Sequence, residues 1–296
     1  MSEHQAGAWS LGRHGDVPCA TATMTRKEPQ TLLFIGDLHL DSQYTDRAGI
    51  KRVMDEAVQR KAAIVLLGDT WDAMQSRGDK RANKAALMER YAGRDDYMNA
   101  LLEDVAAFLR PYASNIWILL HGNHDTALTR FHEVDLVKLL ARDLNQSGGA
   151  VVTPGYQSYL AVRGLVEGTR GGGGILSFGF VTHGAGGASP VTKGVIGAAR
   201  RATTYPDAEF IVSGHLHTDF TVSHTQYRVS QRGRAFVAKQ RHVQVGAHKV
   251  ESPTAPSWSV EKGMPPAVPT SYWLEFFRAR GENPPRPIVH RFVEAV

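Results

Sequence analysis

Five short apolar runs, each followed within two residues by a motif of Asp, His, Asn and Gly, constrain the fold of this chain more than any other feature. The runs occupy residues 31–35, 63–67, 115–120, 175–182 and 209–213. Their length and β-branched content are typical of buried strands. Since α/β proteins bind ligands at the carboxyl ends of their strands, we expect the motifs to meet at one edge. In chain order the motifs are Asp37-Leu38-His39, Gly68-Asp69-Thr70-Trp71-Asp72, Gly122-Asn123-His124-Asp125, His183-Gly184 and Gly214-His215-Leu216-His217.

Helical patterns lie between these runs. Asp46 can cap a helix whose apolar residues from Ile50 to Val58 recur every three or four positions. Further helices are predicted over residues 97–110, 134–144 and 191–203. Beyond residue 218, strand and turn signals dominate. This order predicts an α/β (α+β) fold in which two packed sheets are flanked by helices.

The chain has the size and composition of one domain with a full core. It has 296 residues, of which 42% are hydrophobic. We expect residues 1–28 to be a disordered N-terminal extension and residues 29–296 to form a single domain. The polar stretch 73–94 is expected to be an insertion that could form a lid, and residues 219–296 the strand-rich C-terminal part.

Composition excludes several protein classes. The single cysteine, Cys19, rules out an intrachain disulfide and zinc sites built from cysteine pairs. The sequence has no apolar run of membrane-spanning length, and its first residues lack the apolar core of a signal peptide. A cytoplasmic protein that contacts no membrane is therefore expected. The formal charge of +5 permits an anionic partner without requiring one.

One stretch is basic and free of acidic residues. Residues 220–250 carry six Lys or Arg side chains and no Asp or Glu, on what is predicted to be a hairpin with its bend at Arg232-Gly233. Basic side chains bind phosphates, and Tyr227 and Phe236 could stack on bases. A solvated edge strand that resists aggregation is the alternative. The candidate substrate-binding residues are Arg228, Arg232, Arg234 and Arg241.

Together, the motifs supply the donors that two divalent cations need. Cations about 3.5–4 Å apart overcome the charge of a phosphate ester by clamping its oxygens and activating a bound water. Imidazole and oxygen ligands favour Mn, Fe, Zn or Ni over Ca. The sequence offers Asp37, Asp69, Asn123, His39, His124, His183, His215 and His217.

With these motifs in this order, the chain resembles the calcineurin-like metallophosphoesterase family over about residues 31–218. The resemblance implies a four-layer αββα sandwich of two mixed β-sheets flanked by helices. It also implies two divalent metal ions, with Mn favoured and Fe, Zn or Ni as alternatives. Within the family, the resemblance is nearest to the stand-alone bacterial and phage phosphodiesterase and repair-nuclease-like branch.

The resemblance also implies a role for each motif residue. Residues expected at the first metal are Asp37, His39, Asp69 and His217, with Asp69 bridging to the second. Residues that complete the second metal are Asn123, His183 and His215. His183 is favoured over His121 and His224 because a clean strand pattern leads into it.

Three further motif residues are expected to act without binding metal. The resemblance implies that His124 stabilises the transition state or protonates the leaving group, a task that suits an imidazole. Asp125 is expected to orient His124. Asp72 is expected to contact a metal ligand instead of a metal.

The expected function is a metal-dependent phosphoesterase in which a hydroxide held between the two metals attacks phosphorus. Because of the basic stretch, the favoured substrate is a phosphodiester of DNA, RNA or a nucleotide. One alternative is a phosphomonoesterase that acts on a small molecule or a phosphoprotein. The other, from a different class, is a binding module that keeps its metals without catalysis.

Overall fold

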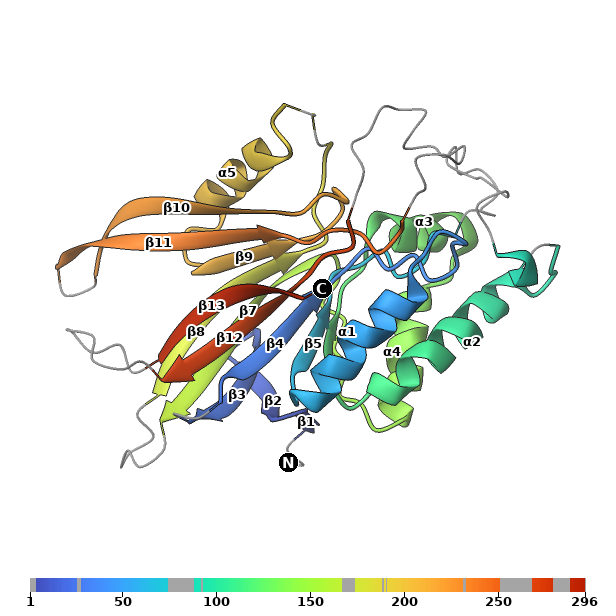
Figure 1. Ribbon diagram of the computed structural model, residues 1–296, viewed down its shortest axis with the longest axis horizontal. Coiled ribbons are helices and arrows are strands. Elements are labelled where there is room, and N and C mark those ends of the chain that lie inside the picture. The colour runs from blue at the N-terminus through green and yellow to red at the C-terminus, as the bar shows by residue number, and fades with distance from the viewer. Residues whose placement is uncertain are drawn as a thin grey trace.

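Two β-sheets pack face to face, with helices outside them (Figure 1). The structure, a computed structural model, describes residues 4–25, 28–73, 88–91, 93–166, 174–187, 189, 191–230, 233–250, 268–278 and 288–295. The larger sheet contains, in spatial order, β1 (His4–Ala6), β2 (Trp9–His14), β3 (Val17–Met24), β7 (Gln157–Val166), β8 (Gly174–Thr182), β9 (Phe210–Ser213), β11 (Ala235–Gln244) and β10 (Phe220–Val229). The smaller sheet contains β13 (Ile288–Ala295), β12 (Ser271–Arg278), β4 (Gln30–Ile35), β5 (Ala63–Leu66) and β6 (Ile116–Leu119).

Both sheets are mixed. In the smaller sheet β4, β5 and β6 are parallel, while β12 pairs antiparallel with β4 and β13. In the larger sheet β8 and β11 run parallel to β9, and the other pairs are antiparallel except β3 with β7. Because β4, β5 and β6 are parallel, their carboxyl ends lie at one edge of the smaller sheet. The carboxyl ends of β8 and β9, which are also parallel, lie together at one edge of the larger sheet. The five motif-bearing loops therefore leave the two sheets on the same side.

The helices form the two outer layers. On the smaller sheet lie α1 (Arg47–Gln59), α2 (Tyr97–Leu109), α3 (Asn123–His132) and α4 (Leu136–Gln146) (Figure 1). The short 3₁₀ turns η2 (Glu89–Tyr91) and η3 (Arg110–Tyr112) precede and follow α2. On the larger sheet, α5 (Val195–Thr204) contacts β10. None of the described helices is long and apolar enough to cross a membrane. The predicted four-layer αββα sandwich is confirmed.

Two apolar cores hold the layers together. Between the sheets, Phe34 packs edge-on against Phe210 with ring centroids 6.3 Å apart, and Trp117 is buried in the same core. Beneath the helices, a second core includes Trp71, Leu101 and other residues of α1, α2 and α4. Helix α1 begins where predicted, because the Asp46 carboxylate accepts a hydrogen bond from Gly49 N at 2.8 Å.

The N-terminal residues differ from the expected disordered extension. Residues 4–24 form β1, β2 and β3, and β3 pairs in parallel with β7. Trp9 anchors them: its side chain is fully buried, its Nε1 donates to Thr31 O at 2.8 Å, and its ring meets Phe276 edge-on. These residues are ordered because β3 pairs with the edge of β7 that would otherwise expose unpaired backbone groups.

The expected lid falls largely outside the described residues. Residues 74–87 and 92 of the stretch 73–94 are not described, and its described remainder includes η2. The backbone of Met88 donates to Asp41 O at 3.4 Å. A lid over the site therefore remains a prediction.

Replacing Trp9 tests the docking of the N-terminal strands. Trp9→Ala is expected to lower the free energy of unfolding by about 3–5 kcal/mol, because it removes a fully buried aromatic side chain. The measurement is urea unfolding followed by circular dichroism. Arg13→Ala, at an exposed position of β2, serves as the control and should change stability by less than about 0.5 kcal/mol. Equal stability of wild type and Trp9→Ala would contradict the packing described.

Candidate metal centre

The five motif loops interlock through backbone hydrogen bonds. Asp37 N donates to Gly68 O and His39 N to Asp69 O, both at 3.1 Å. On the side of the larger sheet, Gly214 N donates to His183 O at 3.0 Å. The two sheets thus deliver their polar side chains to one place from loops that brace each other.

The backbone is strained where these side chains converge. Motif residues in the left-handed region are Asp37 (φ 51°), His39 (φ 45°), Asp69 (φ 48°), His215 (φ 78°) and His217 (φ 60°). Residues with a side chain rarely adopt this conformation, and such strain persists only where surrounding structure fixes it. Its concentration in the motif loops marks this edge as a functional site.

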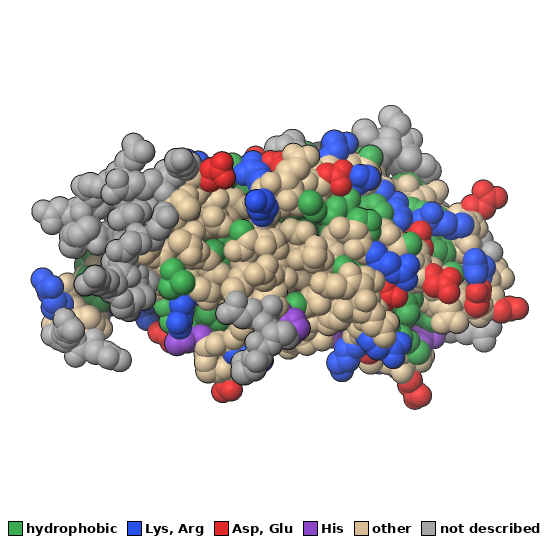
Figure 2. All heavy atoms as spheres, turned by 90° about the horizontal axis from the view of Figure 1, so that it is seen from below, with side chains coloured by type: hydrophobic (Ala, Val, Ile, Leu, Met, Phe, Trp, Pro, Cys, Tyr) green, Lys and Arg blue, Asp and Glu red, His purple; other side chains and the backbone are tan. Residues whose placement is uncertain are grey.

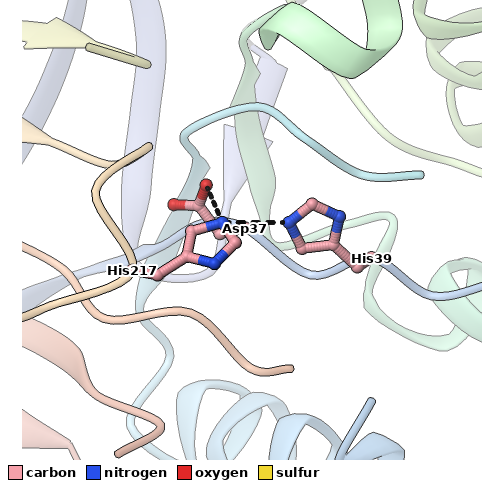
Figure 3. Close-up of side chains that lie close together, drawn as sticks. All are labelled: Asp37, His39 and His217. Carbon is pink, nitrogen blue, oxygen red and sulfur yellow. Dashed lines mark hydrogen bonds and ion pairs between the residues drawn. The ribbon is translucent and has the colours of Figure 1, made fainter. Parts of the chain in front are cut away.

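One cluster joins Asp37, His39 and His217. His217 Nε2 lies 3.6 Å from Asp37 Oδ1 and 3.3 Å from His39 Nε2, so that the two rings point their nitrogens at each other (Figure 3). Burial lowers the pKa of both imidazoles, which favours their neutral, ligand-competent forms. Because ligand atoms of all three residues lie within 4.8 Å of one another, one cation can contact all of them.

A second cluster joins Asp69, Asn123, His183 and His215. His183 Nε2 lies 3.3 Å from Asp69 Oδ2 and 3.0 Å from Asn123 Oδ1. Asn123 Oδ1 is also 2.8 Å from His215 Nδ1. His183 therefore lies at this site, whereas its rival His121 contacts Asp135 at 3.0 Å. The other rival, His224, stacks edge-on against the His242 ring on β10 and β11.

The hydrogen bonds of His183 test whether a cation fits. Its Nδ1 lies 2.8 Å from Leu67 O, a pure acceptor, so Nδ1 carries a proton. In the neutral ring, the Nε2 lone pair then faces the oxygens of Asp69 and Asn123, an arrangement that repels unless a cation or proton lies between them. Burial opposes a charge on His183, but the carboxylates of Asp69 and Asp37 raise its pKa to about 9. A metal ion between these groups would relieve the same repulsion, so the residues fit one.

The two central carboxylates are buried and electrostatically linked. Burial raises the pKa of Asp37 to about 7, and the charge of Asp69 adds to this shift. Burial also opposes ionisation of Asp69, but the imidazoles of His183 and His124 hold its pKa well below the usual range. Buried carboxylates persist in proteins when cations pair with them. Divalent metals at the two clusters would meet this requirement.

His124 contacts Asp72 instead of Asp125. Its Nδ1 donates to Asp72 O at 2.7 Å and lies 3.6 Å from Asp72 Oδ1. Asp125 instead uses Oδ2 to accept from Gly122 N at 2.8 Å, which caps the first turn of α3. The expected orienting role of Asp125 is thus corrected, since α3 begins at Asn123 and its open amide end attracts the carboxylate.

Asp72 links several groups at the edge of the centre. Its Oδ1 lies 3.2 Å from His39 Nδ1, and its Oδ2 lies 2.9 Å from Lys249 Nζ. Asp72 thus contacts His39, one of the expected ligands, and its role behind a metal ligand stays a prediction. The motifs do not indicate Lys249, because it lies more than 30 residues beyond the last of them in the sequence. Its place at the end of the basic stretch was the only signal.

The described candidate substrate-binding arginines lie on or next to strands β10 and β11. Strands β10 and β11 form a ribbon that projects beyond the rest of the sheet (Figure 1). Arg228, on β10, pairs with Asp207 at 2.9 Å, and Arg241 lies on β11. Arg234 is exposed beside the bend, and Arg232 lies outside the described residues.

Substitution of Gly122 tests the crowding around Asp69. The backbone of Gly122 has an ordinary φ of −105°, but a Cβ there would lie 2.0 Å from Asp69 Oδ1. Gly122→Ala should therefore displace the carboxylate and weaken Mn²⁺ binding by about 10–100-fold, measured by isothermal titration calorimetry. Gly187→Ala, where an added Cβ meets nothing within 4 Å, should bind Mn²⁺ as wild type does. Unchanged binding by Gly122→Ala would remove Asp69 from the metal-binding residues.

Comparisons with known proteins place the chain in a family. The family model for calcineurin-like phosphoesterases matches residues 30–219. Among solved structures, a predicted phosphoesterase from Streptococcus pneumoniae TIGR4 is 14% identical, with 83% of each chain covered and a TM-score of 0.31. Vps29 from Chaetomium thermophilum is 12% identical, with 90% of this chain and 97% of that chain covered and a TM-score of 0.35. No curated protein matches. Because the family model covers more than half of the chain, we conclude that this protein is a metal-dependent phosphoesterase of the calcineurin-like family.

Proposed function

We propose that the protein hydrolyses a phosphodiester of a nucleic acid or nucleotide with the help of two divalent cations, Mn²⁺ being favoured. The observation that carries this proposal is the pair of clusters at the sheet edges, which supply imidazole, carboxylate and amide donors suited to such ions. The proposed metal ligands are Asp37, His39, Asp69, Asn123, His183, His215 and His217. Asp69 is the proposed bridge, because its charge acts on the groups of both clusters.

The ions, when bound, would neutralise the phosphoryl oxygens and lower the pKa of a water. The chain's own contribution is to hold the donors rigidly, since each loop is braced by its neighbour. The carbonyls of Leu67 and Gly186 accept from the outer nitrogens of His183 and His215. These hydrogen bonds orient the rings and leave the opposite nitrogens toward the site.

His124 is proposed as the residue that assists the leaving oxygen. Its Nδ1 is held by the Asp72 carbonyl, so the ring has one orientation. Its Nε2 points toward the centre, 3.9 Å from Asp69 Oδ2, and the side chain retains 13% exposure. A ring fixed at one nitrogen and accessible at the other can donate a proton to a leaving group.

The ribbon supports the choice of a nucleic-acid or nucleotide substrate. On β10 and β11, Tyr227 is 94% exposed, and Lys239 is exposed on the same face, because alternate residues of paired strands share a face. Arg241 follows on that face, closer to the metal centre. In contrast, on the face seen in Figure 2, Lys and Arg side chains are interspersed with Asp and Glu at the end of the molecule where the helices lie. An acid-free basic strip with an exposed aromatic ring suits a phosphate backbone with bases.

A hydrolysis panel tests the proposed reaction. With Mn²⁺ present, the panel compares bis(p-nitrophenyl) phosphate, p-nitrophenyl phosphate and end-labelled single- and double-stranded DNA, with a chelator control. Chelator-sensitive cleavage of the diester and of DNA is the expected result. Activity on the monoester alone would replace the proposal with a phosphomonoesterase. Inactivity on all four, with metal bound, would favour a binding module.

Replacement of His124 separates proton transfer from metal binding. His124→Ala should bind two Mn²⁺ ions as wild type does, yet hydrolyse bis(p-nitrophenyl) phosphate about 10²–10⁴-fold more slowly, the usual size of a lost acid–base contribution. Asp69→Ala is the matched control and should lose both metal binding and activity. Both variants are measured by calorimetry and by initial rates. A wild-type rate in His124→Ala would remove this residue from the mechanism.

Replacement of ribbon cations tests the substrate class. Alanine at Arg234, Lys239 and Arg241 should weaken DNA binding and reduce the slope of log K against log salt by about 2 to 3, since each lost phosphate contact removes nearly one unit. Filter binding at several salt concentrations measures the slope. Alanine at the exposed residues Arg13, Arg52 and Lys61, far from the ribbon in the fold, removes the same charge and should leave the slope unchanged. Equal slopes for the two triple variants would reject the ribbon as the DNA-binding surface.

A further inference from the structure

The peptide that joins Gly214 to His215 is held at both of its polar atoms. Its carbonyl accepts from Gln244 Nε2 at 2.5 Å. Its N–H, that of His215, donates to the two oxygens of Asp37 at 2.9 and 3.1 Å. A Cβ on Gly184 would lie 2.8 Å from the same carbonyl, so the space beside it is already full. This peptide carries His215 in its strained conformation and cannot rotate without losing both contacts.

Gln244 is itself held in one orientation. It ends β11, and its parallel neighbour in the sheet is Ser213, the last residue of β9. Ser213 Oγ and Gln244 Oε1 are 2.8 Å apart, and both side chains are buried. An amide oxygen accepts only, so the serine hydroxyl donates to it. That bond turns the amide nitrogen of Gln244 toward Gly214 O.

Arg201, on a helix outside the sheet, donates the first hydrogen bond of this series. On α5, its Nη2 lies 3.2 Å from Ser213 Oγ. A guanidinium can only donate, so it leaves the serine proton free for Gln244. Arg201 is half-buried, and this burial lowers its pKa; none of the ion pairs formed among the described residues includes it. Burying a cation in this way is costly, and a structural role for its directed hydrogen bond accounts for the position.

We propose that Arg201, Ser213 and Gln244 form a positioning chain that sets the metal affinity of the cluster containing His215. The hydrogen bonds run in one direction, from Arg201 through Ser213 and Gln244 to Gly214 O. Among the described residues, the hydrogen bonds of these three side chains reach the Gly214 carbonyl and no side chain of the metal clusters, so their effect passes through the loop. This inference rests on the proposed function, because it takes His215 as a metal ligand.

Gln240, four residues before Gln244 on β11, provides a matched control. Gln240 lies on the same face of β11, is also buried, and donates to Tyr205 O and Ala208 O at 2.8 Å. Gln244→Met and Gln240→Met therefore remove similar amide hydrogen bonds from one strand. Only the first disconnects the metal-binding loop.

The experiment is a two-site Mn²⁺ titration by isothermal calorimetry, with thermal melting of the metal-free proteins. Both variants should melt below wild type by similar amounts. Gln244→Met alone should bind the ion at the His215 cluster about 10–100-fold more weakly, the size expected when a group behind a ligand is lost. The other ion, at the Asp37, His39 and His217 cluster, should bind within a few-fold of wild type.

Other outcomes overturn the inference. Wild-type affinity at both sites in Gln244→Met, or equal weakening by the two glutamine variants, would leave Gln244 with a stabilising role alone. Failure of wild type to bind two ions would overturn the proposed function and this inference with it. The wild-type titration thus separates the two failures.

Ser213 and Arg201, the other two residues of the positioning chain, give a second test if Gln244→Met does not fold. Ser213→Ala removes the hydroxyl, and Ser213→Thr restores one. Arg201→Gln removes the first donor of the positioning chain. Arg200→Gln is its control, because Arg200 is exposed on α5 and takes no part in these hydrogen bonds. Weakened Mn²⁺ binding by Ser213→Ala and Arg201→Gln, with wild-type binding by Ser213→Thr and Arg200→Gln, supports the proposal. Identical binding by all four contradicts it.

Discussion

The burial of two carboxylates, Asp37 and Asp69, at the shared edge of two sheets is the constraint on which the rest of this structure depends. Each is almost completely removed from water, so each needs donors or cations around it. Asp37 receives the His215 backbone N–H, and Asp69 receives that of His124. The imidazoles complete the shell. The loops are strained, and the glycines beside them crowded, because donors must be brought close to these two buried carboxylates.

The same constraint explains why side chains outside the metal clusters are needed to hold the motif loops. A loop in a left-handed conformation returns to a relaxed one unless other groups hold it. On one side, Asp72 fixes His39 and His124, and Lys249 balances its charge. On the other, Gln244 holds the peptide of His215. Rigid donors matter for catalysis because a displacement of about 1 Å can cost 10²-fold in rate.

Much of the fold could be predicted because buried parallel strands leave a plain signal. The apolar runs before the motifs are β4, β5, β6, β8 and β9, and the predicted hairpin is β10 with β11. The N-terminal strands were missed because β2 is exposed along much of its length and carries Gly12 and His14, so few apolar residues mark it. Helix α3 was missed because it buries only Asp125, Ala127 and Leu128. The partners of His124 could not be predicted, since spacing does not reveal which of two nearby aspartates a helix end will capture.

The pairing of β3 with β7 also sets an order of events during synthesis. Residues 17–24 leave the ribosome well before their partner on the larger sheet, residues 157–166, and Trp9 packs against Phe276, which is made later still. Contacts this distant in sequence close late and slow folding. Strands β1, β2 and β3 are therefore made long before they can dock. Until then β7 keeps an open edge, which makes the half-made chain vulnerable to pairing with a neighbour.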